Sequence, residues 1–79
     1  MNYIQDKIPR NEKGQAHGHW RVYYSNGQIA YKGSYVSGIK DGYWEYYYIS
    51  GGVSSKGNYV NDAKVSLWIE HNEEVFYAN

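Results

Sequence analysis

The only tryptophans of this 79-residue chain lie 24 residues apart, at Trp20, Trp44 and Trp68. The surrounding residues repeat with them, since residues 17–41 are echoed by residues 41–65 and a divergent copy begins at Ser66. A period of this length is typical of proteins that stack one supersecondary unit along an axis. The sequence therefore predicts a repeat protein, whose function is to present a binding surface.

Each repeat has the composition of a β-hairpin. Alternating side chains, many aromatic and β-branched residues and frequent glycines favour strands over helices. Asn26-Gly27 is typical of a two-residue turn in which both residues have positive φ. A turn there fixes the register of the two strands and sets these residues opposite each other: Tyr24 and Ile29, Val22 and Tyr31, Trp20 and Gly33, Gly18 and Tyr35.

Glycines face the tryptophans in this register. Trp20 lies across from Gly33, and the same pairing in the second repeat sets Trp44 across from Gly57. A large ring that covers a glycine on the neighbouring strand offsets the poor packing of that glycine. We therefore interpret these four residues and Trp68 as structural, and we expect Trp68 to have no glycine to cover.

The last copy departs from the pattern. Its hairpin is two residues shorter, which places the turn near Asn72-Glu73, and atypical terminal repeats usually cap a stack. In the links between hairpins, Gly38 and then Asp62 occupy a position that requires positive φ. The expected fold is all-β, a single-layer antiparallel β-meander of about six strands. It forms one domain, 1–79, with these parts: a leader or cap over 1–13, a first unit with the preceding link over 14–41, a second unit over 42–65 and a degenerate capping unit over 66–79.

The repeated residues resemble a known family. Both full copies contain Gly-x-Trp-x-x-Tyr-Tyr followed by Lys-Gly-x-Tyr, a pattern similar to that of MORN-repeat variants, in particular the bacterial and phage branch labelled antitoxin-component-like. The resemblance covers residues 17–65 and, more weakly, residues 68–77. It implies a β-meander with a scaffold or binding role, and MORN repeats in larger proteins are linked to membrane lipids and to protein partners.

Charge and cysteine content narrow the classes of partner. The net charge is zero, but residues 1–40 carry six basic and two acidic groups, whereas residues 41–79 carry two basic and six acidic groups. Without a basic stripe the sequence argues against nucleic acid and against a membrane surface as the main ligand. The absence of cysteine and of an apolar N-terminal run leads us to expect a cytoplasmic protein.

No reaction centre is predicted. His17 and His19 have no third ligand near them in sequence, so we expect surface residues and no metal site. Asp41, Glu45 and Glu70 lie on a flat sheet that offers no enclosing pocket to shift their pKa values. We therefore expect no catalysis and no cofactor.

Aromatic side chains provide the leading candidate for a contact surface. A single-layer sheet has no second layer to cover one of its faces, and tyrosine is enriched at interfaces. The proposed protein-binding residues are Tyr24, Tyr31, Tyr35, Tyr46, Tyr48 and Tyr59. The opposite face is the runner-up surface, and it carries Arg21, Tyr23, Lys32, Tyr43 and Tyr47.

Three functions follow from this surface. The leading hypothesis is a non-enzymatic protein-binding module that sequesters or inhibits a protein target, of the antitoxin-like or phage counter-defence type that the resemblance implies. One alternative is a self-assembling structural repeat protein, because the two halves carry opposite charge. The other alternative is an aromatic groove that binds a sugar or another small ligand.

Overall fold

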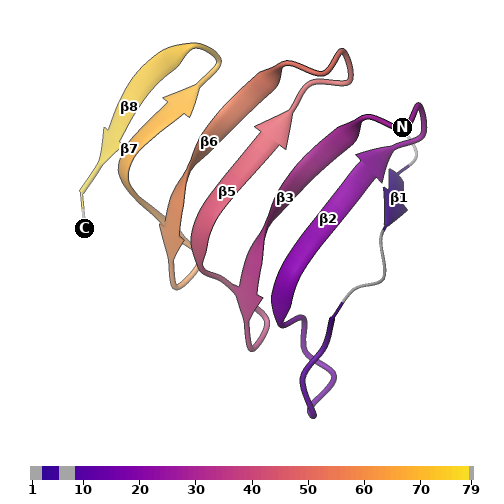
Figure 1. The fold of residues 1–79 in the computed structure, drawn as a ribbon. Helices are drawn as coiled ribbons and strands as arrows, with labels where there is room; N and C mark the ends of the chain where they lie inside the picture. Colours follow the sequence, from indigo (N-terminus) through magenta and orange to yellow (C-terminus); the bar gives the residue numbers. More distant parts are fainter. Residues whose placement is uncertain (1–2, 6–8, 79) are drawn as a thin grey trace.

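A computed structural model of the chain describes residues 3–5 and 9–78. The regular structure in these residues is one eight-stranded sheet (Figure 1). No helix long and apolar enough to cross a membrane occurs in this part of the chain. The strands are β1 (Tyr3–Gln5), β2 (Gly18–Tyr24), β3 (Ile29–Val36), β4 (Ile39–Lys40), β5 (Gly42–Tyr47), β6 (Val53–Val60), β7 (Ala63–Glu70) and β8 (Glu73–Tyr77).

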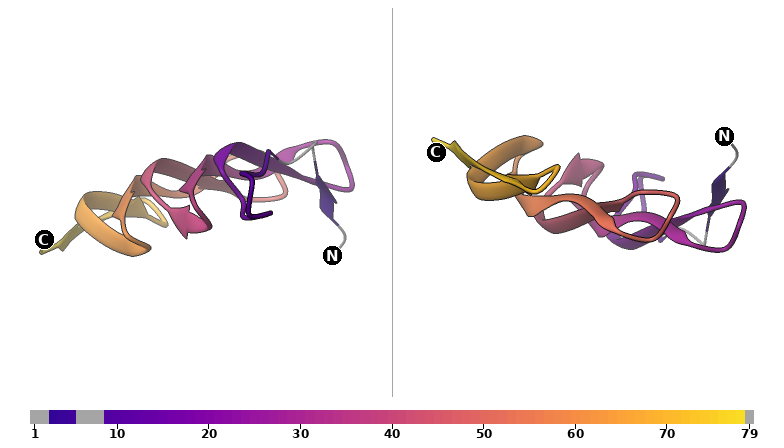
Figure 2. Two further views of the ribbon diagram at one scale, coloured as in Figure 1. Left: turned by 90° about the horizontal axis from the view of Figure 1, so that it is seen from below. Right: turned by 90° about the horizontal axis from the view of Figure 1, so that it is seen from above.

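The strands follow each other in an antiparallel meander. The order across the sheet is β1-β2-β3-β5-β6-β7-β8, and the short β4 also pairs with β3. The molecule measures 37 × 34 × 15 Å, and its edge-on views show a single twisted layer (Figure 2). The predicted all-β, single-layer antiparallel meander is confirmed, with seven strands along the path instead of about six.

The additional strand lies at the leading edge of the sheet. β1 pairs with β2, with Tyr3 opposite Tyr24 and Gln5 opposite Val22. The leader or cap expected over residues 1–13 falls partly outside the described residues, because residues 1–2 and 6–8 are not among them. Within it, residues 3–5 cover the edge of β2 as an additional strand.

The predicted register is correct along most of each hairpin. Trp20 pairs with Gly33 between β2 and β3, and Trp44 pairs with Gly57 between β5 and β6. Alternation along the strands therefore sends all three tryptophans to one face of the sheet. This face and its opposite are the two surfaces on which a function has to be sought.

The first hairpin ends differently from the prediction. The expected two-residue turn would give both Asn26 and Gly27 a positive φ, but of the two only Gly27 takes one (90°). The amide of Gly27 donates to the carbonyl of Tyr24 at 3.0 Å, which makes a longer loop with a β-bulge. A turn followed by a left-handed glycine is a common alternative hairpin closure. As a consequence Tyr23, and not Tyr24, lies opposite Ile29.

The third hairpin turns one residue earlier than predicted. His71 and Asn72 have φ values of 52° and 69°, and Glu70 pairs with Glu73. The prediction of a turn at Asn72-Glu73 is therefore wrong. A two-residue hairpin turn needs positive φ at both positions, and His and Asn enter that region more readily than Glu.

The links between hairpins are tight turns that contact each other along one side of the sheet. Asp62 has a φ of 69° at the position where Gly38 has 84°, as predicted. The Asp62 carboxylate accepts the amide of Lys40 at 2.7 Å, and the Asp62 amide donates to the Lys40 carbonyl at 3.0 Å. These two bonds anchor the later link to the earlier one and compensate for the strained backbone of Asp62.

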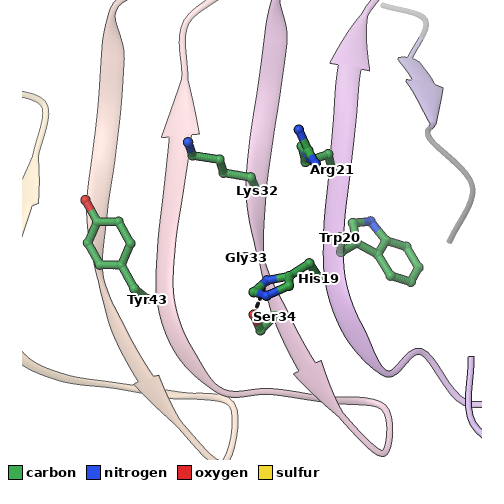
Figure 3. A pocket seen from close by; sticks show the side chains of 7 residues that line it. All are labelled: His19, Trp20, Arg21, Lys32, Gly33, Ser34 and Tyr43. Carbon is green, nitrogen blue, oxygen red and sulfur yellow. Dashed lines mark hydrogen bonds between the residues drawn. The ribbon is translucent and has the colours of Figure 1, made fainter. Parts of the chain in front are cut away.

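The tryptophans cover glycines, but not in the pairs predicted. A Cβ added to Gly33 would overlap the indole of Trp44, and one added to Gly57 would overlap the indole of Trp68. Each ring thus covers a glycine of the preceding hairpin, and the expectation that Trp68 has no glycine is wrong. The reason is that Gly33 has a tryptophan on both sides, since the β3–β5 register brings Trp44 beside it as well. The Trp20 ring points away from β3, to the other side of β2 (Figure 3).

Candidate functional site

One face of the sheet, which we call the ladder face, carries a continuous row of aromatic rings. Tryptophan and tyrosine alternate across the strands in edge-to-face contact, with centroid separations between 4.8 and 6.5 Å. This geometry is the favoured one for aromatic pairs. The row consists of Trp20, Tyr35, Trp44, Tyr59, Trp68 and Tyr77.

Two lysines cover the ladder. Lys40 places its Nζ 5.5 Å from the Trp44 ring centroid and 5.0 Å from that of Tyr59. Lys64, 24 residues later, lies 4.7 Å from the Trp68 centroid. Cation–π contacts of this kind hold the lysine stems along the rings. The ladder is therefore capped by charged groups of the chain itself, and Trp44 and Trp68 have no exposed surface.

Most tyrosines proposed as the contact surface lie within this packing. Tyr59 is only 7% exposed, so its ring offers no surface to a partner, and Tyr31, Tyr35 and Tyr46 are half-buried against the same cluster. The hydroxyls of Tyr46 and Tyr59 are hydrogen-bonded at 2.9 Å. Burial, reinforced by this bond, raises the pKa of Tyr46 far above its usual value.

The other two proposed tyrosines sit at the hairpin ends. The Tyr24 hydroxyl donates to the Tyr47 carbonyl at 2.7 Å and ties the first hairpin to the second. Tyr48 is 40% exposed, and its hydroxyl lies 2.7 Å from Nδ1 of His71. Of the six residues, Tyr48 has the most accessible ring.

We call the opposite side the charged face, because a row of ionic side chains crosses its centre: Arg21, Lys32, Glu45 and Lys56. The predicted cross-strand pairs Arg21–Lys32 and Glu45–Lys56 are both present. Lys32 Nζ also lies 3.4 Å from Glu45 Oε1 on the neighbouring strand. Glu45 thus forms a salt bridge with Lys32 and lies opposite Lys56 in the register of the sheet.

Two tyrosine hydroxyls converge on Glu45. Tyr43 donates to Oε2 at 2.7 Å, and Tyr47 donates to Oε1. Partial burial alone would raise the pKa of Glu45, but the hydrogen bonds from Tyr47, Tyr43 and Lys32 outweigh it and lower that pKa. Burial and the same hydrogen bonds raise the pKa values of Tyr43 and Tyr47 to about 12. Glu45 is therefore held as a carboxylate and the two tyrosines are held as phenols.

A shallow hollow of about 470 Å³ opens on this face beside the charged row (Figure 3). Within it, Ser34 Oγ lies 3.0 Å from His19 Nδ1. The hollow is lined by His19, Trp20, Arg21, Lys32, Gly33, Ser34 and Tyr43. Three residues of the runner-up surface, Arg21, Lys32 and Tyr43, are thereby brought together.

The two histidines near the first strand have separate environments. His17 Nδ1 accepts the Ser37 amide at 3.1 Å, whereas His19 pairs with Ser34. Among residues 3–5 and 9–78 there is no group of three or more His, Cys, Asp or Glu residues that could hold a metal ion.

Sequence reasoning missed the apolar side chains of the charged face. Phe76 is 75% exposed and pairs with Leu67, which is 49% exposed. Val36 and Val60 are about half exposed, at 49% and 51%. Each of these residues is next in sequence to a ladder residue, so strand alternation directs it to the other face. The exposure of these residues on the charged face could therefore have been predicted from the alternation in the sequence.

Comparison with protein-family models finds no match, and comparisons with curated proteins and with solved structures find none either. The assignment of a function therefore depends on the geometry of the two faces.

Proposed function

We propose that the protein is a non-enzymatic protein-binding module that sequesters or inhibits a protein target, and that it contacts this target through the charged face. The observation that carries the proposal is the exposed pair Phe76 and Leu67, at 75% and 49%, on the charged face. Tyr43, which is 50% exposed, adds a second aromatic ring to that face.

The composition of the charged face suits a protein interface. Aromatic residues and arginine are enriched at such interfaces, and clustered exposed apolar side chains mark binding sites. The sheet extends 37 by 34 Å, which accommodates the roughly 800 Å² that each partner contributes to an interface of ordinary size. The ladder face is the less favourable surface, because its rings pack on each other and lie under Lys40 and Lys64.

Affinity capture from a bacterial lysate tests the function and the face together. We expect the wild-type protein to retain a target that Leu67→Ser/Phe76→Ser loses, because this variant removes the exposed apolar pair. Tyr48→Ser, which changes an exposed ring of the ladder face, is the matched control and is expected to retain the same target. Far-UV circular dichroism of each variant verifies the fold. Capture of nothing by the wild type contradicts the function, and equal capture by the double variant contradicts the choice of face.

Self-assembly is the second candidate, and the open edge of β8 favours it. Among the described residues β8 pairs with β7 alone, so its outer backbone groups are left for another strand. Light scattering at low and high salt separates the two functions. Assembly driven by the oppositely charged halves grows at low salt, whereas a monomer at every ionic strength excludes it.

A further inference from the structure

The outer edge of β8 is open in the part of the chain that the structure describes, where β8 pairs with β7 alone (Figure 1). Glu70 and Glu73 are the first and fourth residues of the turn between these strands, and such residues bond to each other through their backbones. Because antiparallel strands alternate between bonded and non-bonded pairs, the backbone groups of Glu74 and Phe76 point away from β7. An incoming strand can therefore bond to the amide and the carbonyl of both residues.

The apolar side chains beside this edge lie on the charged face. Phe76 is 75% exposed and is one of the two residues whose backbone points outward, and Leu67 lies across from it at 49%. On the ladder face the Tyr77 hydroxyl donates to Glu70 at 2.6 Å, and Lys64 Nζ lies 5.4 Å from the Tyr77 ring centroid. A strand added to β8 can therefore cover Phe76 without displacing the contacts that Tyr77 already makes.

Val75 distinguishes this edge from the boundaries between hairpins. It lies across from Trp68, at the position where the other two hairpins have Gly33 and Gly57. At each boundary the tryptophan of the next strand packs over that glycine. The side chain of Val75 occupies the space that such a ring needs, so a strand added to β8 requires a small residue beside it. This argues against a second copy that extends the ladder through its own β2, which carries Trp20.

The charge of β8 favours a basic partner strand. Glu73 and Glu74 are both exposed, and the strand, EEVFY, contains no basic residue. Glu74 lies across from Ile69, whose apolar side chain leaves the carboxylate uncompensated on that side. Opposite charges on neighbouring strands stabilise a sheet. A second copy of β8 has no basic residue to place beside these glutamates, so the edge matches a basic strand better than it matches itself.

We infer that the protein target adds a strand to the outer edge of β8, with an apolar residue beside Phe76, a small residue beside Val75 and a basic residue beside Glu74. The inference rests on the proposed function for the identity of the partner as a protein, and it names the kind of segment through which that partner is held. In this mode of recognition, main-chain hydrogen bonds supply affinity and alternate side chains supply specificity. An antiparallel strand meets the three residues in the order apolar, small, basic.

Titration with a blocked peptide tests the edge directly. The probe is Thr-Val-Ala-Lys-Thr, acetylated and amidated, and the readout is the amide signals of Glu74 and Phe76 in ¹H–¹⁵N correlation spectra of the full chain. We expect saturable shifts. N-methylation of the peptide valine removes an amide that points at β8 and is expected to weaken binding about tenfold. N-methylation of the peptide alanine, whose amide points away, is the matched control and is expected to change the affinity less than about twofold.

Variants of the chain test the side-chain requirements. Phe76→Ser is expected to weaken peptide binding about fivefold and Glu74→Gln about threefold, within the range of one cross-strand pair. Glu73→Gln removes the same charge from the ladder face and is expected to have less than about half the effect of Glu74→Gln. Val75→Gly is expected to admit Thr-Val-Trp-Lys-Thr, which the wild type binds about fivefold more weakly than the alanine peptide. The dispersion of the spectra verifies the fold of each variant.

Three results would overturn the site: no saturable shift, equal weakening by the two N-methylated peptides, or equal weakening by Glu73→Gln and Glu74→Gln. Broadening of the same amide signals as the concentration of the free protein rises would assign the edge to a second copy and would overturn it as well.

Competition during lysate capture separates this inference from the proposed function. We expect excess Thr-Val-Ala-Lys-Thr to release the target that the wild type retains. A target that is captured but not released leaves the function standing and rules out the edge as its site. Peptide binding without any captured target contradicts the function and leaves the edge as a strand-binding site.

Discussion

Trp20 and Trp44 occupy the same position of the repeat, yet their surroundings differ. Trp44 is fully buried over Gly33 and donates its Nε1 hydrogen to the Ser34 carbonyl at 3.1 Å. Trp68 repeats this arrangement with Gly57 and the Asn58 carbonyl, at 3.0 Å. The Nε1 of Trp20 is buried as well, but it has no acceptor among the described residues.

The difference shows what a structural unit of this protein is. Trp20 belongs to a complete hairpin but packs differently from Trp44, so the hairpin that contains a tryptophan does not determine its packing. The packing of the tryptophan is determined by the preceding strand, because that strand supplies both the glycine and the carbonyl acceptor. At the leading end the repeat position of that glycine is occupied by Pro9. The boundaries between hairpins, and not the hairpins themselves, are therefore the sites that hold the sheet together.

The largest loss of stability at a boundary between hairpins is expected from a substitution that adds a side chain to its glycine. Gly33→Ala and Gly57→Ala would each drive a methyl group into an indole ring, and we expect a loss of about 3 kcal/mol of unfolding free energy, at the upper end for overpacking. Gly52→Ala is the matched control, since its added Cβ would make ordinary contact with Tyr48 at 3.8 Å. Urea unfolding measures all three variants. Equal stability of Gly33→Ala and Gly52→Ala would refute the role of the boundary.

Replacing the tryptophans by phenylalanine compares the boundaries with the leading end directly. Trp44→Phe and Trp68→Phe remove a satisfied hydrogen bond and leave a void, whereas Trp20→Phe removes a buried donor that has no acceptor in the part of the chain that the structure describes. Because an unsatisfied buried donor costs roughly 1–3 kcal/mol, we expect Trp20→Phe to be about 2 kcal/mol less destabilising than the other two. Urea unfolding followed by far-UV circular dichroism avoids the changed fluorescence. A Trp20→Phe variant as unstable as Trp44→Phe would contradict the comparison.

Low pH is expected to affect the stability of the second boundary, at Trp68, more than that of the first, at Trp44. Lys64, over the second boundary, bonds to Glu70 at 2.8 Å, whereas the equivalent repeat position beside Lys40 is Tyr46. The hydrogen bonds from Lys64 and then from Tyr77 lower the pKa of Glu70 below its ordinary 4.5. The carboxylate therefore stabilises the fold above pH 4.5, and this contribution disappears as the pH falls through the lowered value.

We accordingly expect the unfolding free energy to fall with acid less steeply in Glu70→Gln than in the wild type. Some slope remains in the variant, because the pKa of Glu45 is lowered as well. Urea unfolding between pH 3 and pH 6 measures the slopes. Identical slopes in the two proteins would show that the ion pair with Lys64 contributes nothing in solution.

The smallest expected effect concerns the residue two positions before each tryptophan. Gly18, Gly42 and Ser66 take the same repeat position, with φ values of 97°, 81° and 62°. A serine in the left-handed region costs roughly 1–2 kcal/mol, and about half of this is offset by the greater freedom of glycine in the unfolded chain. Ser66→Gly is therefore expected to raise stability by about 0.5 kcal/mol, or Tm by about 2–4 °C. A Tm increase of the same size in Ser66→Ala would point to a cause other than the backbone.

Much of the fold was accessible from the sequence, because the repeat carries its own register. The pairs Trp20–Gly33 and Trp44–Gly57 follow from the spacing of each hairpin, and they hold although the closing turn has a different type. The turn at His71-Asn72 could not be predicted from the repeat, because this hairpin is two residues shorter than the others. Which two residues form the turn then depends on small differences in backbone preference.

The packing of side chains was harder to predict than the register. Gly33 has a tryptophan on both neighbouring strands, and only the rotamers decide which ring covers it. The same holds for the charged face. The register determines that Glu45 lies opposite Lys56, whereas side-chain torsions determine that Tyr43 and Tyr47 both donate to Glu45. The burial of four tyrosines proposed as contacts was hard to predict for a related reason, because their rings pack against the ladder and two lysines lie over it.

The covering of each glycine by the next tryptophan also has a consequence for biosynthesis. Gly33 and Trp44 are 11 residues apart, and so are Gly57 and Trp68. Contacts of such short range close rapidly and at low entropic cost. As the nascent chain leaves the ribosome, each hairpin is locked to its predecessor once the first half of the following hairpin has emerged. The sheet can therefore grow from its N-terminal end one strand at a time, without waiting for the C-terminus to be made.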